Sequence, residues 1–358
     1  MGIRKKLLLI KPYNLSDHIQ PCIGLGMLAT AVRDAHDVVI IDGIREKLTP
    51  EKMAAVVAAH QPDVIGWQLF TFDLQVVRAA AQAVKRCNPA IITIAGGPHP
   101  STMPAETLAY FGAALDYAFA GEAEIALRRF LDGAPLGEVP GLAWRDGDTV
   151  RTNERQLVDD LDSLGMPAWD LIKPETYPEA QHGAFFEKFP IAPIMVTRGC
   201  PFHCTFCSGY LVSGHKVRVR SAEHVLREIQ YLYTERGIRE FHIIDDNFTM
   251  KRDYVIDFLR KLKALNLDIS WATPNGVRMD TLDDEMLTLM KETGLYLISV
   301  AAESGSDRIL AAMRKSLTVA KTREAVAMIR RHGIDMAGFF IIGFPGETRA
   351  DVEATIAL

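Results

Sequence analysis

The side chains best placed to do chemistry are three cysteines in the stretch TRGCPFHCTFCSGY, residues 197–210. Cys200, Cys204 and Cys207 have the spacing Cys-x3-Cys-x2-Cys, directly after an apolar run that predicts a strand. Thiolates ligate iron–sulfur clusters, usually four to a cubane. Three thiolates leave one iron without a protein ligand, and an open iron is useful where a substrate or cosubstrate must coordinate the metal directly.

Two other readings of the cysteines remain open from their spacing. A zinc site of the Cys3His type could recruit His203 or His215, although structural zinc loops usually bring their ligands as two spaced pairs. A thioredoxin-like Cys204-x-x-Cys207 pair would leave Cys200 without a role. The tight triplet favours a cluster over both.

The cysteine loop resembles the signature of the radical S-adenosylmethionine (SAM) superfamily, CxxxCxΦC, in which Φ is aromatic and is here Phe206. Three later stretches match the superfamily in order: IIDDNFT at 243–249, VAAESGSDRILAAMRKSLT at 300–318 and IIGFPGET at 341–348. Four ordered motifs on the expected elements make the resemblance specific. It covers the chain from about residue 190 to its end.

The resemblance implies positions for a 4Fe–4S cluster and for SAM. The three cysteines would hold the cluster, and the amino and carboxylate groups of SAM would chelate the fourth iron. SAM itself would be held at the ends of barrel strands, by Phe206 at the adenine, Asp245, Asp246 and Asn247 at the ammonium group, Glu303 and Ser304 at the ribose, Lys315 at the carboxylate, and Gly343 in a turn against the adenine.

These positions also have plainer structural explanations. Phe206 could pack within its own loop, and the Asp-Asp-Asn stretch could cap the next helix. Lys315 and its neighbour Arg314 could lie on a solvated helix face. Ser306 could cap a helix, and the glycines of GFPGE could serve backbone geometry alone. The residues by themselves leave these alternatives open.

The first 135 residues alternate strand and helix patterns, which predicts a doubly wound parallel sheet with ligands beyond the carboxyl ends of its strands. This part resembles the cobalamin-binding domain that precedes the barrel in one branch of the superfamily, through stretches such as VIGWQLFT (64–71), IAGGPHPS (94–101) and DYAFAGEAE (116–124). The resemblance implies cobalamin-binding positions at Gln68, Thr71, Gly96, Gly97, His99, Gly121 and Glu122.

The match to the cobalamin-binding domain has two departures. The common form of the last stretch is Gly-Glu-Gly-Glu, whereas Ala123 interrupts it here. The motif Asp-x-His-x-x-Gly, whose histidine coordinates cobalt from below, is absent, so the lower cobalt ligand is unspecified. His99 is a conceivable cobalt ligand, but a loop histidine more often hydrogen-bonds locally. Cys22 and Cys87 receive no chemical role.

The remaining patterns define the domain organisation. We expect a Rossmann-like domain at 1–135, a hairpin and proline-rich linker at 136–188, and a radical SAM barrel at 189–358. Five strand patterns occur in the last region, whereas a (β/α)6 barrel needs at least one more. We therefore expect an α/β protein with a partial barrel that is truncated at its C-terminus.

Composition limits the classes of partner. The chain of 358 residues is 48% hydrophobic and 24% charged, with a net charge of −5. It therefore lacks the basic excess that is typical of proteins that bind nucleic acid. The short run LLLI near the start is interrupted by Lys11 and predicts neither a signal peptide nor a membrane span. We expect a cytoplasmic enzyme with reduced thiols.

The resulting hypothesis is a cobalamin-dependent radical SAM enzyme that cleaves SAM to a 5′-deoxyadenosyl radical and methylates an unactivated carbon. We expect its substrate to be a small molecule or a peptide natural product, with an external electron donor of the flavodoxin or ferredoxin type. One alternative is a cyclase or oxidoreductase of the anaerobic magnesium-protoporphyrin ester cyclase type. Others are a corrinoid carrier or sensor without radical chemistry, and a tRNA methylthiolating enzyme, which would need further cysteines.

Overall fold

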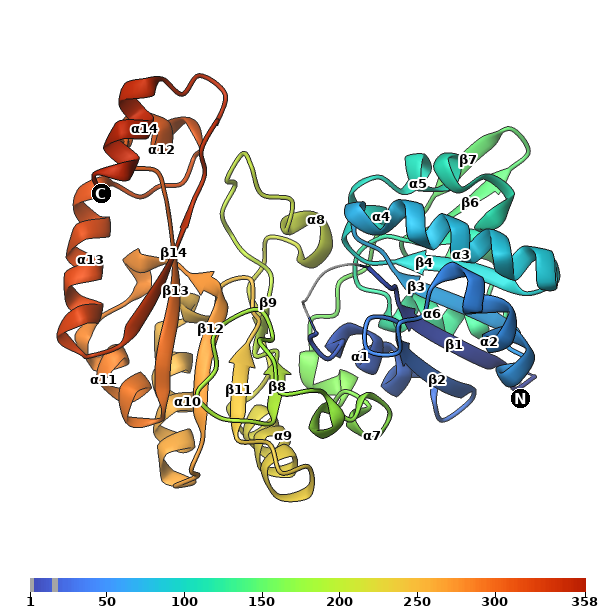
Figure 1. The fold of residues 1–358 in the computed structure, drawn as a ribbon, viewed down its shortest axis with the longest axis horizontal. Helices are drawn as coiled ribbons and strands as arrows, with labels where there is room; N and C mark the ends of the chain where they lie inside the picture. The colour runs from blue at the N-terminus through green and yellow to red at the C-terminus, as the bar shows by residue number, and fades with distance from the viewer. Residues whose placement is uncertain (1–2, 15–18) are drawn as a thin grey trace. The chain divides into compact units, whose positions relative to one another are not determined.

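The computed structural model describes residues 3–14 and 19–358 (Figure 1). The chain forms two compact units, each built around its own sheet. The first unit runs to Pro178 and includes Leu211–Ser213, and the second contains Glu179–Tyr210 and Gly214–Leu358. Among the described residues, no helix is both long enough and apolar enough to cross a membrane.

The first unit contains a seven-stranded sheet in the order β2-β1-β3-β4-β5-β6-β7, in which the first five strands are parallel. This order changes direction between β1 and β3, which is where doubly wound sheets bind ligands. The strands are β1 (Lys6–Lys11), β2 (Asp37–Asp42), β3 (Val64–Gln68), β4 (Ile92–Gly96), β5 (Tyr117–Phe119), β6 (Leu142–Asp146) and β7 (Thr149–Thr152).

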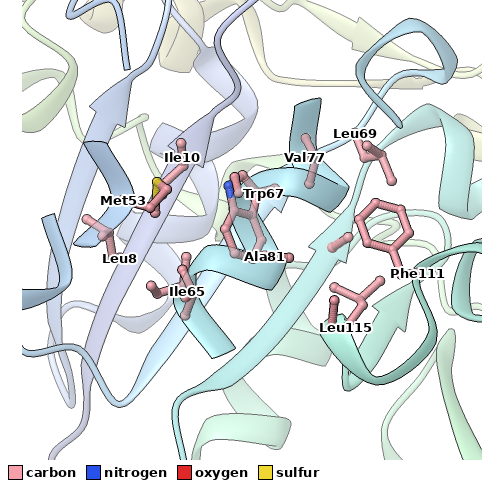
Figure 2. Packing of buried hydrophobic residues seen from close by; sticks show 14 of the residues in the cluster. Leu8, Ile10, Met53, Ile65, Trp67, Leu69, Val77, Ala81, Phe111 and Leu115 are labelled. Carbon is pink, nitrogen blue, oxygen red and sulfur yellow. The ribbon is translucent and has the colours of Figure 1, made fainter. Parts of the chain in front are cut away.

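Successive residues of a strand point to opposite sides of the sheet, so continuous apolar strands make both faces of the first sheet apolar. Helices therefore cover both faces. In β1, Leu8 and Ile10 belong to one core cluster (Figure 2), whereas Leu7 and Leu9 belong to another. The helices are α1 (Ile23–Val32), α2 (Met53–His60), α3 (Leu74–Cys87), α4 (Pro98–Thr102), α5 (Pro104–Phe111), α6 (Glu124–Leu131) and α7 (Trp169–Ile172). A 3-10 turn, Pro50–Lys52, precedes α2, and Thr49 before it makes no side-chain capping bond.

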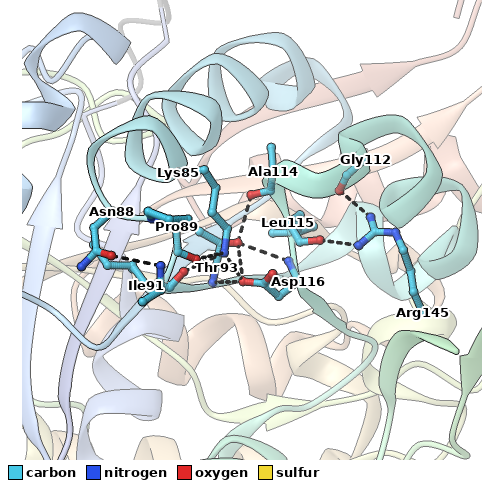
Figure 3. A network of polar contacts seen from close by, with 11 residues as sticks. Lys85, Asn88, Pro89, Ile91, Thr93, Gly112, Ala114, Leu115, Asp116 and Arg145 are labelled. Atoms are coloured by element: carbon cyan, nitrogen blue, oxygen red, sulfur yellow. Dashed lines mark hydrogen bonds and ion pairs between the residues drawn. The ribbon is translucent and has the colours of Figure 1, made fainter. Parts of the chain in front are cut away.

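The hairpin of β6 and β7 extends the first sheet by pairing antiparallel with β5. Its Arg145 donates to the carbonyl oxygens of Gly112 and Leu115 just beyond α5 (Figure 3). It also donates to the carbonyl oxygen of Leu108 within α5. Nearby, the Asp116 carboxylate accepts hydrogen bonds from Lys85 and from the backbone and hydroxyl of Thr93. This network ties together the amino-terminal ends of β4 and β5, opposite the edge where ligands bind.

The second unit contains a five-stranded parallel sheet in the sequential order β8-β11-β12-β13-β14. Helices alternate with the strands, which is the winding of a β/α barrel. The strands are β8 (Ile191–Ile194), β11 (Glu240–Ile243), β12 (Ser270–Val277), β13 (Leu295–Glu303) and β14 (Asp335–Phe340). The helices are α9 (Ala222–Glu235), α10 (Arg252–Ala264), α11 (Asp284–Glu292), α12 (Asp307–Ala312), α13 (Val319–Arg331) and α14 (Arg349–Ile356). The predicted α/β fold class is confirmed.

One strand departs from the prediction. The run PIMVTRG ends as a sheet strand at Ile194, and Thr197–Arg198 (β9) instead pairs antiparallel with Arg218–Val219 (β10). The backbone leaves the sheet here because the Asp245 carboxylate accepts hydrogen bonds from the N–H groups of Val196 and Thr197, at 2.8 and 2.7 Å. The cysteine loop therefore starts from a small two-stranded ribbon.

Candidate active site

The three cysteines lie in the loop between β9 and the short helix α8 (Tyr210–Ser213). Backbone hydrogen bonds hold this loop near its start, from Cys200 N to Gly214 O at 3.2 Å, and in its middle, from Thr205 N to Met313 O at 3.0 Å. All three thiols are free; Cys200 and Cys204 are half-buried, and Cys207 is exposed. The loop is thus fixed in backbone position while its sulfur atoms remain accessible.

The donor set fits an iron–sulfur cluster. Among the described residues, no three His, Cys, Asp or Glu side chains are placed to hold a single metal ion. A cubane does not need that convergence, because each thiolate binds a different iron. The N–H of Gly209 lies 3.4 Å from Cys207 Sγ, the type of hydrogen bond that tunes cluster sulfur ligands. The rings of His203 and His215 contact each other at a tilt of 37°, with centroids 4.1 Å apart.

A buried ion pair lies beside this loop. Lys315 Nζ is 2.7 Å from Glu303 Oε1, and both side chains are less than a tenth exposed. Lys315 Nζ is also 5.8 Å from the centre of the Phe206 ring. Three predicted SAM residues from separate segments are therefore close together. Among the described residues, only the Oε1 atom of the Glu303 carboxylate is bonded to Lys315, and a carboxylate has about four acceptor positions.

The three residues of the Asp-Asp-Asn stretch after β11 differ in their burial and in their contacts. Asp245 is buried and bonded to Val196 and Thr197, and burial raises the pKa of its carboxyl to about 7. Asp246 is exposed and lies near Gly209 of the cysteine loop. Asn247 is 1% exposed, and neither its Oδ1 nor its Nδ2 has a partner among the described residues.

The unpartnered amide of Asn247 is the clearest sign of a polar ligand. A buried amide without hydrogen bonds costs free energy, so such a group usually has a ligand or water to bind. The hydroxyl group of Thr273, within β12, is likewise buried and unpartnered in the described residues. Asn247 follows the carboxyl end of β11, where barrel enzymes place their function.

The remaining predicted SAM residues lie in other contacts. Ser304 is fully buried, with its Oγ 3.2 Å from Thr355 Oγ1 of α14. Ser306 Oγ donates to Asp351 at 2.6 Å, so both serines bind α14. Gly343 has a φ of +87° in an exposed turn. Ser304 directly follows Glu303, and Ile341, two residues before Gly343, donates its N–H to Glu303 O at 2.9 Å. These residues therefore neighbour the Glu303–Lys315 pair, while the two serine hydroxyls bind α14.

Arg278 is a site residue that the sequence analysis missed. Its guanidinium carbon lies 3.6 Å from the centre of the Phe202 ring, inside the cysteine loop. It also donates to Lys315 O at 2.8 Å and binds Asp280 through two nitrogens, at 2.9 and 2.7 Å. The only signal in the sequence is an arginine soon after a strand-end glycine, in NGVRMD, which is too common a pattern to single out.

In the first unit, the predicted cobalamin residues lie at or just after the carboxyl ends of β3, β4 and β5. The Thr71 hydroxyl is 3.0 Å from Nδ1 of His99, which is 7% exposed, and burial lowers the pKa of His99. Gly97 has a φ of +106° and packs against the backbone of Leu69. Phe72, 70% exposed, stacks on Phe70. This edge therefore combines an apolar exposed surface with a neutral imidazole.

Other residues predicted at this edge bind protein groups. Gln68 Oε1 accepts from the thiol of Cys22 at 3.1 Å, and burial raises the pKa of that thiol to about 11. Gly121 N donates to Ser101 Oγ at 2.8 Å. Glu122 accepts from Val158 N at 2.9 Å, so its carboxylate anchors the segment after the hairpin. Gly96, the last residue of β4, accepts at its carbonyl oxygen from Leu69 N at 2.8 Å.

Comparison with known proteins assigns both units to families. The model of the radical SAM superfamily matches residues 194–358, and that of the B12 binding domain matches residues 16–131. These families confirm the prediction of a 4Fe–4S cluster, SAM and cobalamin as cofactors. Because both matches are independent of the geometry above, they also favour a cluster over the zinc and dithiol readings of the cysteines.

Individual proteins are similar over most of the chain. An uncharacterized methyltransferase of Pyrococcus horikoshii is 34% identical over 341 residues, which are 94% of this chain and 72% of that protein. The anaerobic magnesium-protoporphyrin IX monomethyl ester cyclase of Rubrivivax gelatinosus is 26% identical, over 89% of this chain and 58% of the cyclase. The chain thus spans about three quarters and three fifths of these relatives.

A solved structure shares the complete two-unit fold. The radical SAM methyltransferase TsrM of Kitasatospora setae superposes with a TM-score of 0.80, at 19% identity, over 99% of this chain and 70% of TsrM. At this identity the likeness shows the fold alone. Together with the two family matches and the 34% identical relative, it shows that this chain is an enzyme of the radical SAM superfamily, in the branch that carries an amino-terminal B12-binding domain.

Proposed function

We propose that this protein is a C-methyltransferase that uses SAM, a 4Fe–4S cluster and cobalamin to methylate an unactivated carbon. The observation that carries the SAM and cluster part of the proposal is the buried Glu303–Lys315 pair beside the three-cysteine loop, at the strand ends of a barrel. We assign the SAM and cluster site to residues 189–358, cobalamin to residues 1–135, and the connection between them to residues 136–188.

In this proposal the residues near the cysteine loop hold SAM. Glu303 accepts the ribose hydroxyls through the oxygen that Lys315 leaves available. Asn247 supplies a buried amide to the polar end of SAM, and Phe206 lies against the adenine. Asp245 acts indirectly, because its two backbone bonds fix the point where the chain leaves β8 toward the cysteines.

In the first unit, Gly97 and the exposed Phe72 provide a backbone surface and an apolar surface for a large flat ligand. His99 is buried, bonded to Thr71 and held neutral, so we assign it a hydrogen-bonding role at the cobalamin edge. When bound, the cofactors supply the radical and methyl-transfer chemistry, while the protein orients them and excludes water.

The overall reaction balances with two molecules of SAM. Replacing a C–H hydrogen by methyl yields 5′-deoxyadenosine and methionine from one SAM and S-adenosylhomocysteine from the other. The two positive sulfonium charges are lost, so two electrons must enter from an external one-electron donor of the flavodoxin or ferredoxin type. The acceptor of the methyl group is a small molecule or a peptide.

Methyl transfer is favoured over cyclisation by the 34% identical relative, which is named a methyltransferase and shares 94% of this chain. The cyclase relative is 26% identical and shares less of its own length with the chain. The residues that hold SAM would serve both reactions. The fate of the methyl group of SAM therefore separates the two.

The test follows that methyl group without requiring the substrate. The protein is purified without oxygen, reconstituted with iron and sulfide, loaded with hydroxocobalamin, and incubated with a reductant and SAM that carries a trideuterated methyl group. We expect S-adenosylhomocysteine to form and mass spectrometry to find the label on the extracted corrinoid. Bound cobalt and iron with an unlabelled corrinoid would contradict methyl transfer and favour the cyclase type.

Matched cysteine variants control this test. Cys204→Ala removes a proposed cluster ligand, and we expect it to lose cluster iron and formation of 5′-deoxyadenosine. Cys87→Ala removes an exposed cysteine at the end of α3, and we expect the activity of the unchanged protein. A Cys204→Ala protein with full 5′-deoxyadenosine formation would contradict the cluster assignment.

A further inference from the structure

Arg278 joins three separate segments of the second unit. Its guanidinium covers the ring of Phe202 within the cysteine loop, at 3.6 Å from the ring centre. It donates to the backbone oxygens of Lys315 and Ser316, at 2.8 and 3.3 Å. Asp280 holds its other edge through two charge-assisted bonds. The side chain is 7% exposed, so these partners replace most of its water.

The segment to which Arg278 is hydrogen-bonded is the turn of residues 313–316, which follows α12. Arg314 and Ser316 both have left-handed backbones, with φ values of +54° and +53°. Non-glycine residues keep this strained conformation only where the surroundings enforce it. The two hydrogen bonds from Arg278 to the carbonyls of this turn provide such enforcement.

The same turn holds the cysteine loop from the other side. Met313 O accepts from Thr205 N at 3.0 Å, and Cys204 Sγ lies 3.9 Å from Arg314 O. The turn also carries Lys315, whose side chain reaches Glu303. Arg278 therefore contacts the cysteine loop directly through Phe202 and supports the turn on which Cys204 rests.

Arg278 also adds positive charge at the cysteines. Its guanidinium lies over Phe202, two residues before Cys204, and binds the turn that carries Lys315. A guanidinium stays protonated at any working pH. A cluster that gains one electron from its donor becomes more negative, and a nearby fixed cation stabilises that reduced form. Net charge and burial are among the factors that set cluster potentials.

We propose that Arg278 is a positioning residue for the cluster, which both fixes the cysteine loop through Phe202 and the 313–316 turn and raises the reduction potential of the cluster. This inference rests on the cluster assignment in the proposed function. It does not depend on methyl transfer, on cobalamin or on the substrate.

The test compares Arg278→Gln with the unchanged protein, both reconstituted with iron and sulfide. The reduction potential is measured by redox titration followed with electron paramagnetic resonance, without substrate. Iron retention is measured as the rate of iron release to a chelator. We expect Arg278→Gln to shift the potential to more negative values and to release iron several-fold faster.

Three further variants separate charge from geometry. Arg278→Lys keeps the charge but cannot bind Asp280 and two carbonyls together, so we expect a nearly unchanged potential with faster iron release. Phe202→Leu removes the stacking ring only, and we expect the same pattern. Arg252→Gln is the matched control, because Arg252 is a half-exposed arginine of the same unit that binds Asp283 and Glu285.

Each outcome decides the inference. A folded Arg278→Gln protein with the potential and iron release of Arg252→Gln would overturn it. If Arg278→Gln does not fold, Arg278→Lys decides by its iron release: a rate equal to that of Arg252→Gln contradicts the inference, and a faster rate supports it. Unchanged protein that takes up no iron would instead overturn the cluster assignment, and thus the proposed function.

Discussion

Glu303 and Lys315 form a buried ion pair, with Lys315 Nζ 2.7 Å from Glu303 Oε1 and both side chains less than a tenth exposed. Glu303 ends β13 with a left-handed backbone, at a φ of +62°, and Lys315 lies in the turn after α12. The pair links the end of barrel strand β13 to the turn that supports the cysteine loop.

Breaking this pair should destabilise the protein strongly. Lys315→Met leaves the Glu303 carboxylate buried without its cation, which costs about 3–5 kcal/mol for a buried pair. The double variant Glu303→Gln/Lys315→Met should lose less than the sum of the single variants, because the two residues interact directly. Urea unfolding measures all three free energies.

The control for this prediction is Lys261→Met in the same unit. Lys261 binds Glu223 and Asp257 on the surface, where ion pairs contribute little. We expect its unfolding free energy to change only slightly. Equal stability of Lys315→Met and Lys261→Met would show that the buried pair contributes nothing.

Asp245 should make stability depend on pH. Burial raises its pKa from 3.8 to about 7, so the folded state binds more protons than the unfolded state between these values. The unfolding free energy should therefore fall as pH rises through this window, by about 1.4 kcal/mol per pH unit from this group, with no further loss above pH about 7.

The variant Asp245→Asn removes the titrating group. We expect urea unfolding between about pH 5 and pH 8 to show a shallower decline for this variant than for the unchanged protein. Asp253→Asn, at a fully exposed aspartate of α10, should keep the original decline. A decline in Asp245→Asn equal to that of the unchanged protein would contradict the assigned pKa.

Gly97 should be needed for cobalamin. Its φ of +106° is strained for any other residue, and an added Cβ would lie 3.2 Å from Leu69 N and 3.3 Å from Leu69 O. Gly97→Ala should lower the unfolding free energy by about 1–3 kcal/mol. It should also lower the ratio of bound corrinoid to protein after gel filtration, because the backbone can no longer lie as close to the ligand.

Gly133→Ala provides the comparison for Gly97. Gly133 also has a positive φ, of +85°, but an added Cβ would meet nothing within 4 Å. This variant should lose stability through backbone strain and retain its cobalamin. Equal corrinoid content in the two variants would place the cobalamin site away from Gly97.

The hydroxyl of Tyr296 should stabilise the interior of the second unit. It lies 2.7 Å from Glu240 Oε1 and also contacts the backbone oxygen of Phe185. Burial, with the neighbouring Glu240, raises the pKa of Tyr296, so the phenol stays neutral. Tyr296→Phe removes the donor, and we expect the unfolding free energy to fall by about 1–3 kcal/mol.

Tyr231→Phe tests whether that loss depends on the buried partner. Tyr231 is partly buried in α9, and its hydroxyl accepts from Arg236 at 3.0 and 3.1 Å. Thermal or urea unfolding should show a smaller loss for Tyr231→Phe. A loss as large as that of Tyr296→Phe would mean that burial of the Tyr296 hydroxyl beside Glu240 has no special effect.

The fold was largely predictable because its signals are local. Strands such as Lys6–Lys11 are continuous apolar runs, and the helices between them repeat every three to four residues. The exceptions arise from long-range bonds. β8 ends early because the Asp245 carboxylate binds the backbone N–H groups of Val196 and Thr197, which lie 49 and 48 positions before it in the chain. The residue pattern of a single strand cannot reveal a contact over that separation.

The site was predictable only in part for the same reason. Glu303, Lys315 and Phe206 lie together as expected, whereas Ser304 and Ser306 bind α14 and Glu122 binds Val158. A polar residue after a strand can face a ligand or a neighbouring backbone, and its type is the same in both cases. Arg278 was missed because its partner Phe202 is far away in sequence.

The sequence by itself determined the cysteine loop, the order of its motifs and hence the family, because those ligands lie within a few residues of one another. Tertiary structure alone decided which charges meet. It paired Lys315 with Glu303, set Arg278 against Phe202, and left the buried amide of Asn247 without a partner in the part of the chain that the structure describes. Such contacts depend on how strands and turns pack, and packing is not encoded in the spacing of any one segment.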